Sequence, residues 1–183
     1  MFYEMEIAGL KRKLPLFPVD KETQIAAFII FGDVEMTKAA AKELLEKAPE
    51  FDLLMTAEAK SIPLIYEMAS QAGMNDYIIA RKGVKVYMKE PISVKVNSIT
   101  THGQQYLYLG EDEVNRVRGK RVLIVDDVIS TGESLQALEN LANEAGAKIV
   151  GKMAILGEGD AMERDDITVL APLPVFDVEG NVK

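Results

Sequence analysis

The residues best suited to chemistry lie in one short stretch, V-D-D-V-I-S-T-G-E-S, which ends at Ser134. Its two carboxylates, Asp126 and Asp127, repel a phosphate but suit sugar hydroxyls or a hard cation such as Mg²⁺, bound directly or through water. The loop that follows, residues 130–134, has small hydroxyl side chains around Gly132, and glycine lets the backbone approach a ligand closely. Main-chain N–H groups at the start of a helix lack partners and attract anions. Hydroxyl-binding carboxylates beside an anion-binding loop indicate a sugar phosphate as the ligand.

The elements around this stretch would place it at a ligand-binding edge. The run V-L-I-V at residues 122–125 is apolar without alternation, which is typical of a central parallel strand covered on both faces. Leucines then recur at helical spacing after the loop, and ligands of parallel sheets bind outside the carboxyl ends of the strands. Because neighbouring strand residues point to opposite faces, both aspartates meet one ligand only if the strand ends near Asp126. The alternative is that Asp127 or Ser130 only caps the helix.

Strand-like and helix-like patterns alternate along the rest of the chain. We predict strands over residues 25–31, 51–57, 77–80, 148–156 and 168–176, and helices over residues 34–48, 61–72, 112–118 and after the loop. Residues 1–20 read as an irregular lead with two prolines. Residues 84–109 alternate weakly, as antiparallel strands with a loop between them do. The alternation of strands and helices predicts an α/β fold with a mostly parallel sheet.

Composition restricts the class of protein. The chain has 183 residues, 48% hydrophobic and 27% charged, which fits one globular domain over residues 1–183. The net charge of −8 provides no general field for nucleic acid. The absence of cysteine excludes disulfides and Cys-based metal sites. No apolar run approaches the roughly 18 residues of a membrane span, and the first residues carry no apolar signal core. We therefore expect a cytoplasmic protein that binds neither nucleic acid nor membrane.

Two further segments could meet an anion. T-A-E-A-K-S at residues 56–61 joins a predicted strand to a helix, so its N–H groups could hold one; the alternative is a Glu–Lys pair on a surface helix. Arg81, Lys82 and Lys85 follow a short buried strand, where open sheets bind ligands; the alternative is a solvated run of charge. The only histidine is His102. An imidazole has an ordinary pKa of ~6.5, which suits proton transfer or anion contact, although most exposed loop histidines do neither.

The stretch V-D-D-V-I-S-T-G-E-S resembles the phosphoribosyl-pyrophosphate (PRPP) motif of the type I phosphoribosyltransferases. K-L-P-L-F-P and A-P-L-P-V-F, near the two ends of the chain, resemble the adenine branch. The resemblance implies a doubly wound core, a flexible antiparallel hairpin at residues 84–109, and a small hood from the termini that includes residues 1–25. Three matched positions depart from the adenine branch, because Glu133 and Ser61 each stand in place of a glycine and Lys60 stands in place of an arginine.

The resemblance also implies a role for each matching residue. Asp126 and Asp127 would hold the ribose hydroxyls and, with Lys85, form the catalytic group. The 5′-phosphate would lie in the loop of Ile129, Ser130, Thr131, Gly132, Glu133 and Ser134. The pyrophosphate would meet Ala59, Lys60, Arg81, Lys82 and Lys85. No residue matches the loop glutamate that helps the base in the adenine branch, but Thr101 or His102 falls near its place. Family-like candidates for contact with the base are Val19, Ile25, Ala26 and Phe28.

The activity implied is Mg²⁺-dependent transfer of a phosphoribosyl group from PRPP to a nucleobase. The base would be a purine, with adenine the first candidate, and the products would be pyrophosphate and a nucleoside 5′-monophosphate, as in purine salvage. Mg²⁺ would be held through PRPP and water, with Asp126 and Asp127 as candidate ligands. Relatives are commonly dimers, so a homodimer is expected by analogy. The alternative is a non-catalytic PRPP-binding sensor of the same fold.

Overall fold

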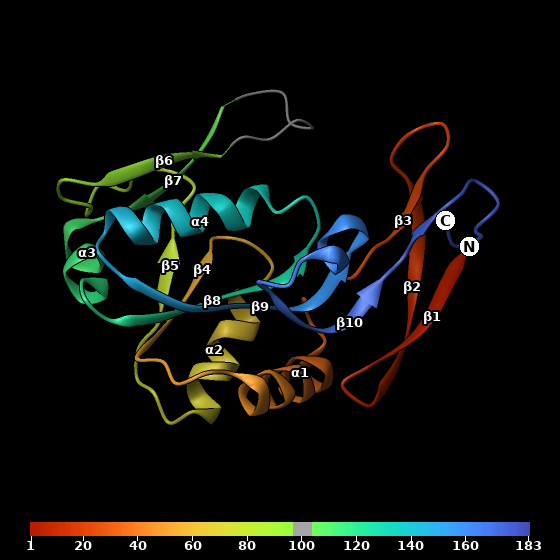
Figure 1. Ribbon diagram of the computed structural model, residues 1–183, viewed down its shortest axis with the longest axis horizontal. Helices are drawn as coiled ribbons and strands as arrows, with labels where there is room; N and C mark the ends of the chain where they lie inside the picture. Colours follow the sequence, from red (N-terminus) through yellow and green to blue (C-terminus); the bar gives the residue numbers. More distant parts are fainter. Residues whose placement is uncertain (97–103) are drawn as a thin grey trace.

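The computed structural model describes residues 1–96 and 104–183 and has a parallel sheet at its centre (Figure 1). Five strands lie in the order β10-β9-β8-β4-β5, and all neighbouring pairs are parallel. They are β4 (Leu53–Ala57), β5 (Ile78–Ala80), β8 (Arg121–Ile129), β9 (Lys148–Glu158) and β10 (Thr168–Leu173). The unalternating apolar run lies in β8, at the middle of the sheet. The predicted α/β class with a mostly parallel sheet is confirmed.

Helices cover both faces of this sheet, as a doubly wound fold requires (Figure 1). Helices α1 (Val34–Lys47) and α2 (Ile62–Gln71) lie on one face, and α4 (Glu133–Glu144) lies on the other, near the short α3 (Glu111–Val117). Sequence signals fix where these helices begin. The carboxylate of Asp33 accepts a hydrogen bond from the N–H of Met36 at the start of α1, which is a standard N-cap.

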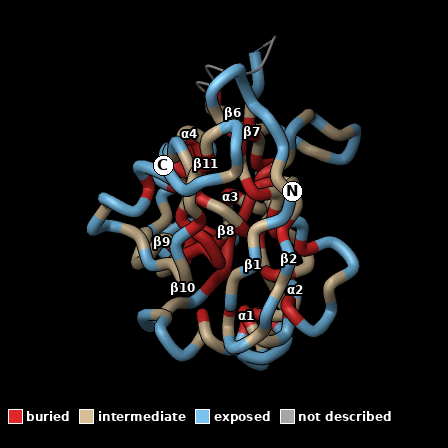
Figure 2. Tube along the Cα trace, turned by 90° about the vertical axis from the view of Figure 1, so that its right-hand side faces the viewer, coloured by how far each residue is buried: buried red, intermediate tan, exposed pale blue. Residues whose placement is uncertain are grey.

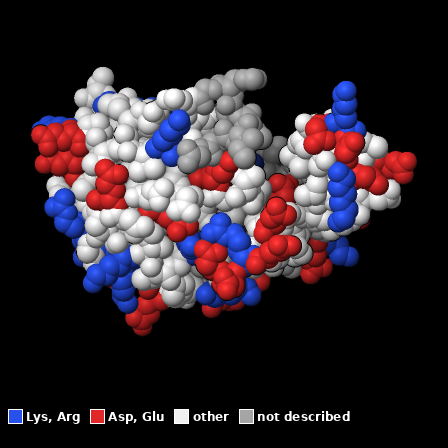
Figure 3. Space-filling view, turned by 45° about the horizontal axis from the view of Figure 1, so that its top comes forward, with Lys and Arg blue, Asp and Glu red and all other residues white. Residues whose placement is uncertain are grey.

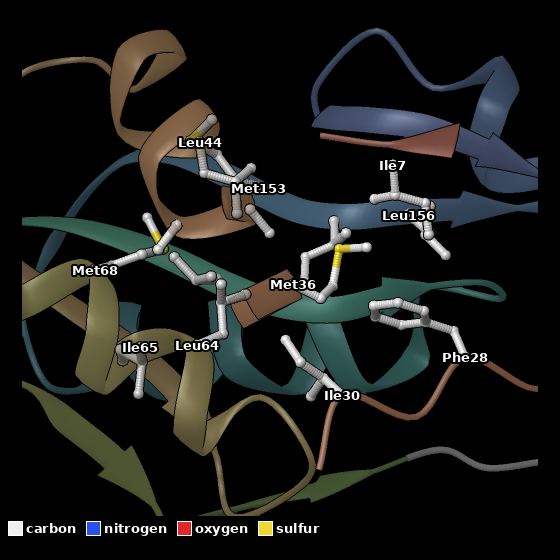
Figure 4. Close-up of a cluster of buried hydrophobic side chains, with 14 of the residues drawn as sticks. Ile7, Phe28, Ile30, Met36, Leu44, Leu64, Ile65, Met68, Met153 and Leu156 are labelled. Atoms are coloured by element: carbon white, nitrogen blue, oxygen red, sulfur yellow. The ribbon is translucent and has the colours of Figure 1, made fainter. Parts of the chain in front are cut away.

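An apolar core lies on each face of the central sheet. On one face, side chains of α1 and α2 such as Met36, Leu44 and Met68 pack against Leu156 and its neighbours (Figure 4). On the other face, the leucines of α4 pack against the opposite side of the same strands. Figure 2 shows that the buried segments gather in the interior, while exposed segments lie mainly at the periphery. Helices therefore pack on both faces of the sheet, and this packing fixes the positions of the strand ends relative to one another.

A second, antiparallel sheet is built from the two ends of the chain. Its order is β1-β2-β3-β11, with β1 (Phe2–Ile7), β2 (Leu10–Pro18), β3 (Gln24–Ala26) and β11 (Val175–Phe176). The N- and C-termini lie close together beside these strands (Figure 1). Ile7 and Phe176 are buried and belong to the core under α1 and α2, so this sheet packs on the main body of the molecule.

The prediction of an irregular lead over residues 1–20 is wrong, because this segment forms the β1–β2 hairpin. Ala8 (φ 49°) and Gly9 (φ 75°) make its turn, and two residues with positive φ suit the twist of a hairpin. The alternating residues of β1 and β2 carry the signal for this hairpin. The prolines at 15 and 18 obscure it, although proline is tolerated at strand edges and ends.

The strand predicted over residues 25–31 is also shorter than expected. Only Gln24–Ala26 pairs with neighbouring strands, as β3. Beyond it the chain crosses from the small sheet to α1, burying Phe28 and Ile30 and exposing Ile29 and Phe31. Buried and exposed side chains therefore alternate as they do in a strand, but no neighbouring strand lies alongside this segment to form a hydrogen-bonded ladder.

Residues 84–109 form an antiparallel pair only in their second half. Strands β6 (Ile92–Val96) and β7 (Gln105–Leu109) pair as predicted. Residues 84–91 form no strand, and Val86 is fully exposed. Thr101 and His102 lie outside the described residues.

The single strand predicted over residues 168–176 is divided at Pro174 into β10 and β11, which belong to different sheets. The N–H that proline lacks interrupts the ladder at this point. Among the helices that the structure describes, none combines the length and apolarity needed to cross a membrane.

Candidate active site

The two carboxylates of the central motif lie near the carboxyl end of β8. The strand continues to Ile129, because β9 supplies partners as far as the Ile129–Gly157 pair. The strand therefore does not end near Asp126, which is the condition under which a regular strand would let both aspartates meet one ligand. Both carboxylates nevertheless lie by the loop that follows β4, since Asp127 contacts Lys60 and Asp126 interacts with the hydroxyl of Ser61.

The two aspartates have unequal surroundings. Burial raises the pKa of Asp126 above its ordinary range, and the neighbouring charge of Asp127 raises it further. The main-chain N–H of Asp127 donates a 2.9 Å hydrogen bond to Oδ1 of Asp126. The side chain of Asp127 is only 6% exposed, and its Oδ2 lies 3.2 Å from Nζ of Lys60. Oδ2 accepts no hydrogen bond of good geometry within the described residues, so this ion pair leaves it free to accept one from a ligand.

The loop after β8 surrounds a small cavity of about 60 Å³. Gly132 has φ 80°, a left-handed conformation that favours glycine, and it lies immediately before α4. The N–H of Glu133 faces the hydroxyl of Thr131 at 3.5 Å, too long to occupy it fully. The cavity is lined by Asp126, Val128, Ile129, Ser130, Thr131, Gly132, Glu133, Ser134 and Leu135. It therefore combines hydroxyls and helix-start N–H groups with one of the two aspartates, as a sugar phosphate needs.

The loop after β4 has one polar contact within itself and others that join it to this site. The hydroxyls of Thr56 and Ser61 are buried and 2.7 Å apart. Nζ of Lys60 bridges the Asp127 carboxylate and the carbonyl of Phe28, to which it donates a 3.3 Å hydrogen bond. Lys60, matched by resemblance to a pyrophosphate-binding position, thus contacts Asp127, one of the two carboxylates expected to hold the ribose hydroxyls.

The cations after β5 lie at the same edge, and one of them is already paired. Arg81 lies 3.2 Å from Glu58 and also donates to the hydroxyl of Tyr87. The N–H of Lys82 donates a 2.9 Å hydrogen bond to the same Glu58 carboxylate, the main reason that the pKa of Glu58 is lowered. Glu58 therefore ties the β4 loop to the β5 loop. Basic and acidic side chains are similarly mixed across the face drawn in Figure 3.

The residues predicted to hold the base are placed very differently from one another. Ala26 and Phe28 are buried in the core, Ile25 is half-buried and Val19 is exposed. The carbonyl of Phe28 is the part of this group that reaches the site, through Lys60.

Sequence reasoning missed two residues in the segment 158–166, which reads as a solvated loop. Glu158 ends β9 and is half-buried, and burial raises its pKa while the charge of Lys60 lowers it. Arg164 follows the short helical turn η1 (Gly159–Glu163) and reaches Gly132. Both contacts join segments far apart in the chain, so no local pattern indicates them.

The donor atoms at this edge fit a cation that is shared with a ligand. Asp126 and Asp127 supply carboxylate oxygens, which Mg²⁺ prefers, and Mg²⁺ commonly keeps water and phosphate oxygens as its other ligands. Within residues 1–96 and 104–183, no group of three or more acidic or histidine side chains could hold a metal ion. Asp126 and Asp127 are the side chains at this edge that could share Mg²⁺ with a phosphate ligand.

In an open parallel sheet, loops that expose helix-start N–H groups after adjacent strands form the kind of edge at which phosphorylated ligands bind. A model of the phosphoribosyl transferase domain matches residues 34–175. The chain belongs to this family of enzymes.

Individual relatives agree with this assignment. A hypoxanthine/guanine phosphoribosyltransferase of Methanohalophilus mahii is 27% identical over 164 residues, which cover 85% of this chain and 82% of that protein. An adenine phosphoribosyltransferase of Nocardia farcinica is 32% identical over 127 residues, covering 69% of this chain and 64% of that one. Several other curated relatives are matched over little more than half of their length. The crystal structure of adenine phosphoribosyltransferase from Thermoanaerobacter pseudethanolicus superposes with a TM-score of 0.71 at 20% identity, covering 87% of this chain and 95% of that one.

Proposed function

We propose that this protein transfers the phosphoribosyl group of PRPP to a purine base, releasing pyrophosphate and forming a purine nucleoside 5′-monophosphate. One observation carries the proposal. One edge of the sheet holds the glycine-containing loop after β8, the carboxylates Asp126 and Asp127, and the loop after β4 with Lys60. PRPP presents a phosphate, ribose hydroxyls and a pyrophosphate in the same order.

The reaction is a displacement at C1 of the ribose. The bond from C1 to the pyrophosphate oxygen breaks with its electron pair, a ring nitrogen of the base bonds to C1, and the proton of that nitrogen is released. Asp126 and Asp127 hold the ribose hydroxyls, and their negative charge favours the positive charge that develops on the ring. Lys60 and Lys85, together with Arg81 and Lys82, neutralise the pyrophosphate as it departs.

Mg²⁺ is the cofactor of this proposal: Asp126 and Asp127 would be its candidate protein ligands, and it would supply charge neutralisation to the leaving pyrophosphate. The protein groups do the remaining work. The loop of residues 130–134 fixes the 5′-phosphate, and Thr101 or His102 remains a candidate for contact with the base.

Adenine is the first candidate for the base. A 6-oxopurine would call for a hydrogen-bond donor near O6, which an adenine site would not require. The two relatives described above carry names with different purines, which supports a purine without choosing between them. By analogy with relatives, we also propose that the protein works as a homodimer.

A second candidate is a PRPP-binding sensor without catalysis, and one observation favours it. Lys60 stands in place of an arginine and is engaged with Asp127 and the carbonyl of Phe28. A lysine is a point charge, whereas arginine is a bidentate fork, so pyrophosphate would be held differently.

PRPP binding tests what both candidates share. In titration calorimetry the purified protein should bind PRPP with Mg²⁺ present, and the Asp127→Asn variant should bind it more weakly because the variant loses the charge that accepts hydroxyl hydrogen bonds. The absence of PRPP binding by the wild-type protein would overturn both candidates.

A further inference from the structure

The cavity proposed for the 5′-phosphate has no positive side chain in its wall. Among the described residues that line it there is neither lysine nor arginine, while Asp126 and Glu133 each bring a carboxylate. A phosphate dianion in this cavity would therefore depend on main-chain N–H groups, hydroxyls and the start of α4. Two carboxylates in the wall oppose these attractions, so a cation just outside the wall would matter.

Arg164 is that cation. A Cβ atom built on Gly132 would lie 2.5 Å from Nη1 of Arg164. The guanidinium therefore occupies the space that a side chain at position 132 would need, directly against the main chain of the loop. In Figure 1 the helical turn η1, which precedes Arg164, lies by the N-terminal end of α4.

The guanidinium is held in this orientation by acidic partners. Nε and Nη2 of Arg164 donate to the two carboxylate oxygens of Asp166, each at 2.8 Å. Nη2 also lies 4.0 Å from Glu139 on α4. Lys152 of β9 pairs with both of these carboxylates. Asp166 and Glu139 thus fix one edge of the guanidinium, and the Nη1 edge faces the loop.

We propose that Arg164 is a positioning residue for the 5′-phosphate of the substrate. It supports the main chain at Gly132 and adds positive charge behind the loop, which the wall of the cavity lacks. This inference rests on the proposed function and adds to it a residue outside the PRPP motif. At a separation of several ångströms near a protein surface, a unit charge changes the affinity for an anion by about fivefold to tenfold.

The test compares two substitutions of paired arginines. Arg164→Gln removes the proposed cation. Arg12→Gln is the matched control, because Arg12 is also held by two carboxylates, Asp33 and Glu35, and has a similar exposure of 25% against 30%. Affinity is measured by calorimetry for PRPP and, separately, for pyrophosphate, which lacks the ribose 5′-phosphate.

We expect Arg164→Gln to weaken PRPP binding by about fivefold to tenfold and to change pyrophosphate binding by less than about twofold. Arg12→Gln should change neither, and Arg164→Lys should regain part of the lost PRPP affinity because it keeps the charge. Equal weakening for both ligands would indicate a general structural role and overturn the inference. Unchanged PRPP affinity in Arg164→Gln would also overturn it, whereas failure of the wild-type protein to bind PRPP would overturn the proposed function itself.

Discussion

Two adjacent carboxylates near the end of a strand destabilise the folded state of the protein that carries them. Asp126 is half-buried beside the negative charge of Asp127, and both its burial and this charge raise its pKa. The ionised form of Asp126 is therefore less stable in the folded chain than in the unfolded chain. Functional sites commonly keep such unfavourable groups because a ligand uses them.

The pH dependence of stability should report this cost. Because the folded state raises the pKa of Asp126, the folded protein retains a proton that the unfolded chain has lost, and the stability contributed by Asp126 falls as the pH rises above about 4. Asp126→Asn removes this loss. Chemical denaturation should show that the variant gains stability relative to wild type between pH 4 and 7, while it loses phosphoribosyl transfer. A variant less stable than wild type at pH 7 would contradict this reading.

The positive charge of Lys60 offsets the negative charge of the other carboxylate, Asp127. The variant Lys60→Met leaves Asp127 almost fully buried without its ion-pair partner. We expect a loss of about 1 kcal/mol in the free energy of unfolding. The loss is no larger because Lys60 is itself 45% exposed. Lys60→Arg should retain the pair.

The control for Lys60 is an exposed pair of the same kind. Lys13 lies 2.7 Å from Glu4, but both side chains are about 70% exposed, so Lys13→Met should have no measurable effect on urea denaturation. Equal effects of Lys60→Met and Lys13→Met would show that the Lys60–Asp127 contact contributes nothing particular.

At the scale of elements, the site depends on the junction from β8 through its loop to α4. Gly132 and Gly146 lie immediately before and soon after α4 and have nearly equal positive φ values of 80° and 79°. The two glycines differ in what surrounds them. A Cβ at Gly132 would meet the guanidinium of Arg164, whereas a Cβ at Gly146 would only touch the side chain of Arg118 at 3.4 Å.

Gly132 and Gly146 together give a test of the loop, in which Gly146 is the control for backbone strain. Each change to alanine places a Cβ in the left-handed region and should lower the free energy of unfolding by about 1–2 kcal/mol. Gly132→Ala should in addition weaken PRPP binding, whereas Gly146→Ala should not. Thermal unfolding and PRPP titration of both variants measure the two effects, and equal PRPP affinities would argue against a phosphate-binding role for the loop.

Elements with local signals could be predicted from the sequence. The strand–loop–helix of the PRPP motif is such a case, because its apolar run, small residues and leucine spacing are contiguous. The β1–β2 hairpin carries a local signal too, in Ala8 and Gly9, but its prolines hide it. Residues 25–31 show alternation without a partner strand, and a partner depends on the folded chain, not on the segment itself.

At the scale of the whole molecule, the features that could not be predicted from the sequence are contacts between segments far apart in the chain. Glu58 joins the loops after β4 and β5, and Arg164 reaches the loop after β8 from beyond β9. A sequence pattern predicts which edge of the sheet these residues share only when each follows a recognised strand. Arg164 follows η1, which lies within an acidic segment that gives no such signal.

The whole fold brings the proposed substrate groups to one edge. The parallel sheet fixes the spacing of its strand ends, and the small terminal sheet places the carbonyl of Phe28 beside Lys60. The two candidate functions share this architecture and differ only in whether a base attacks the bound PRPP.

Product formation from PRPP therefore tests the central claim most directly. The protein is incubated with PRPP, Mg²⁺ and, in turn, adenine, hypoxanthine, guanine and a set of pyrimidines, and both pyrophosphate and nucleotide are quantified. We predict that at least one purine yields its nucleoside 5′-monophosphate together with an equal amount of pyrophosphate, and that Asp127→Asn, still folded, makes much less. Measurable PRPP binding without product from any base would contradict the account and favour the sensor.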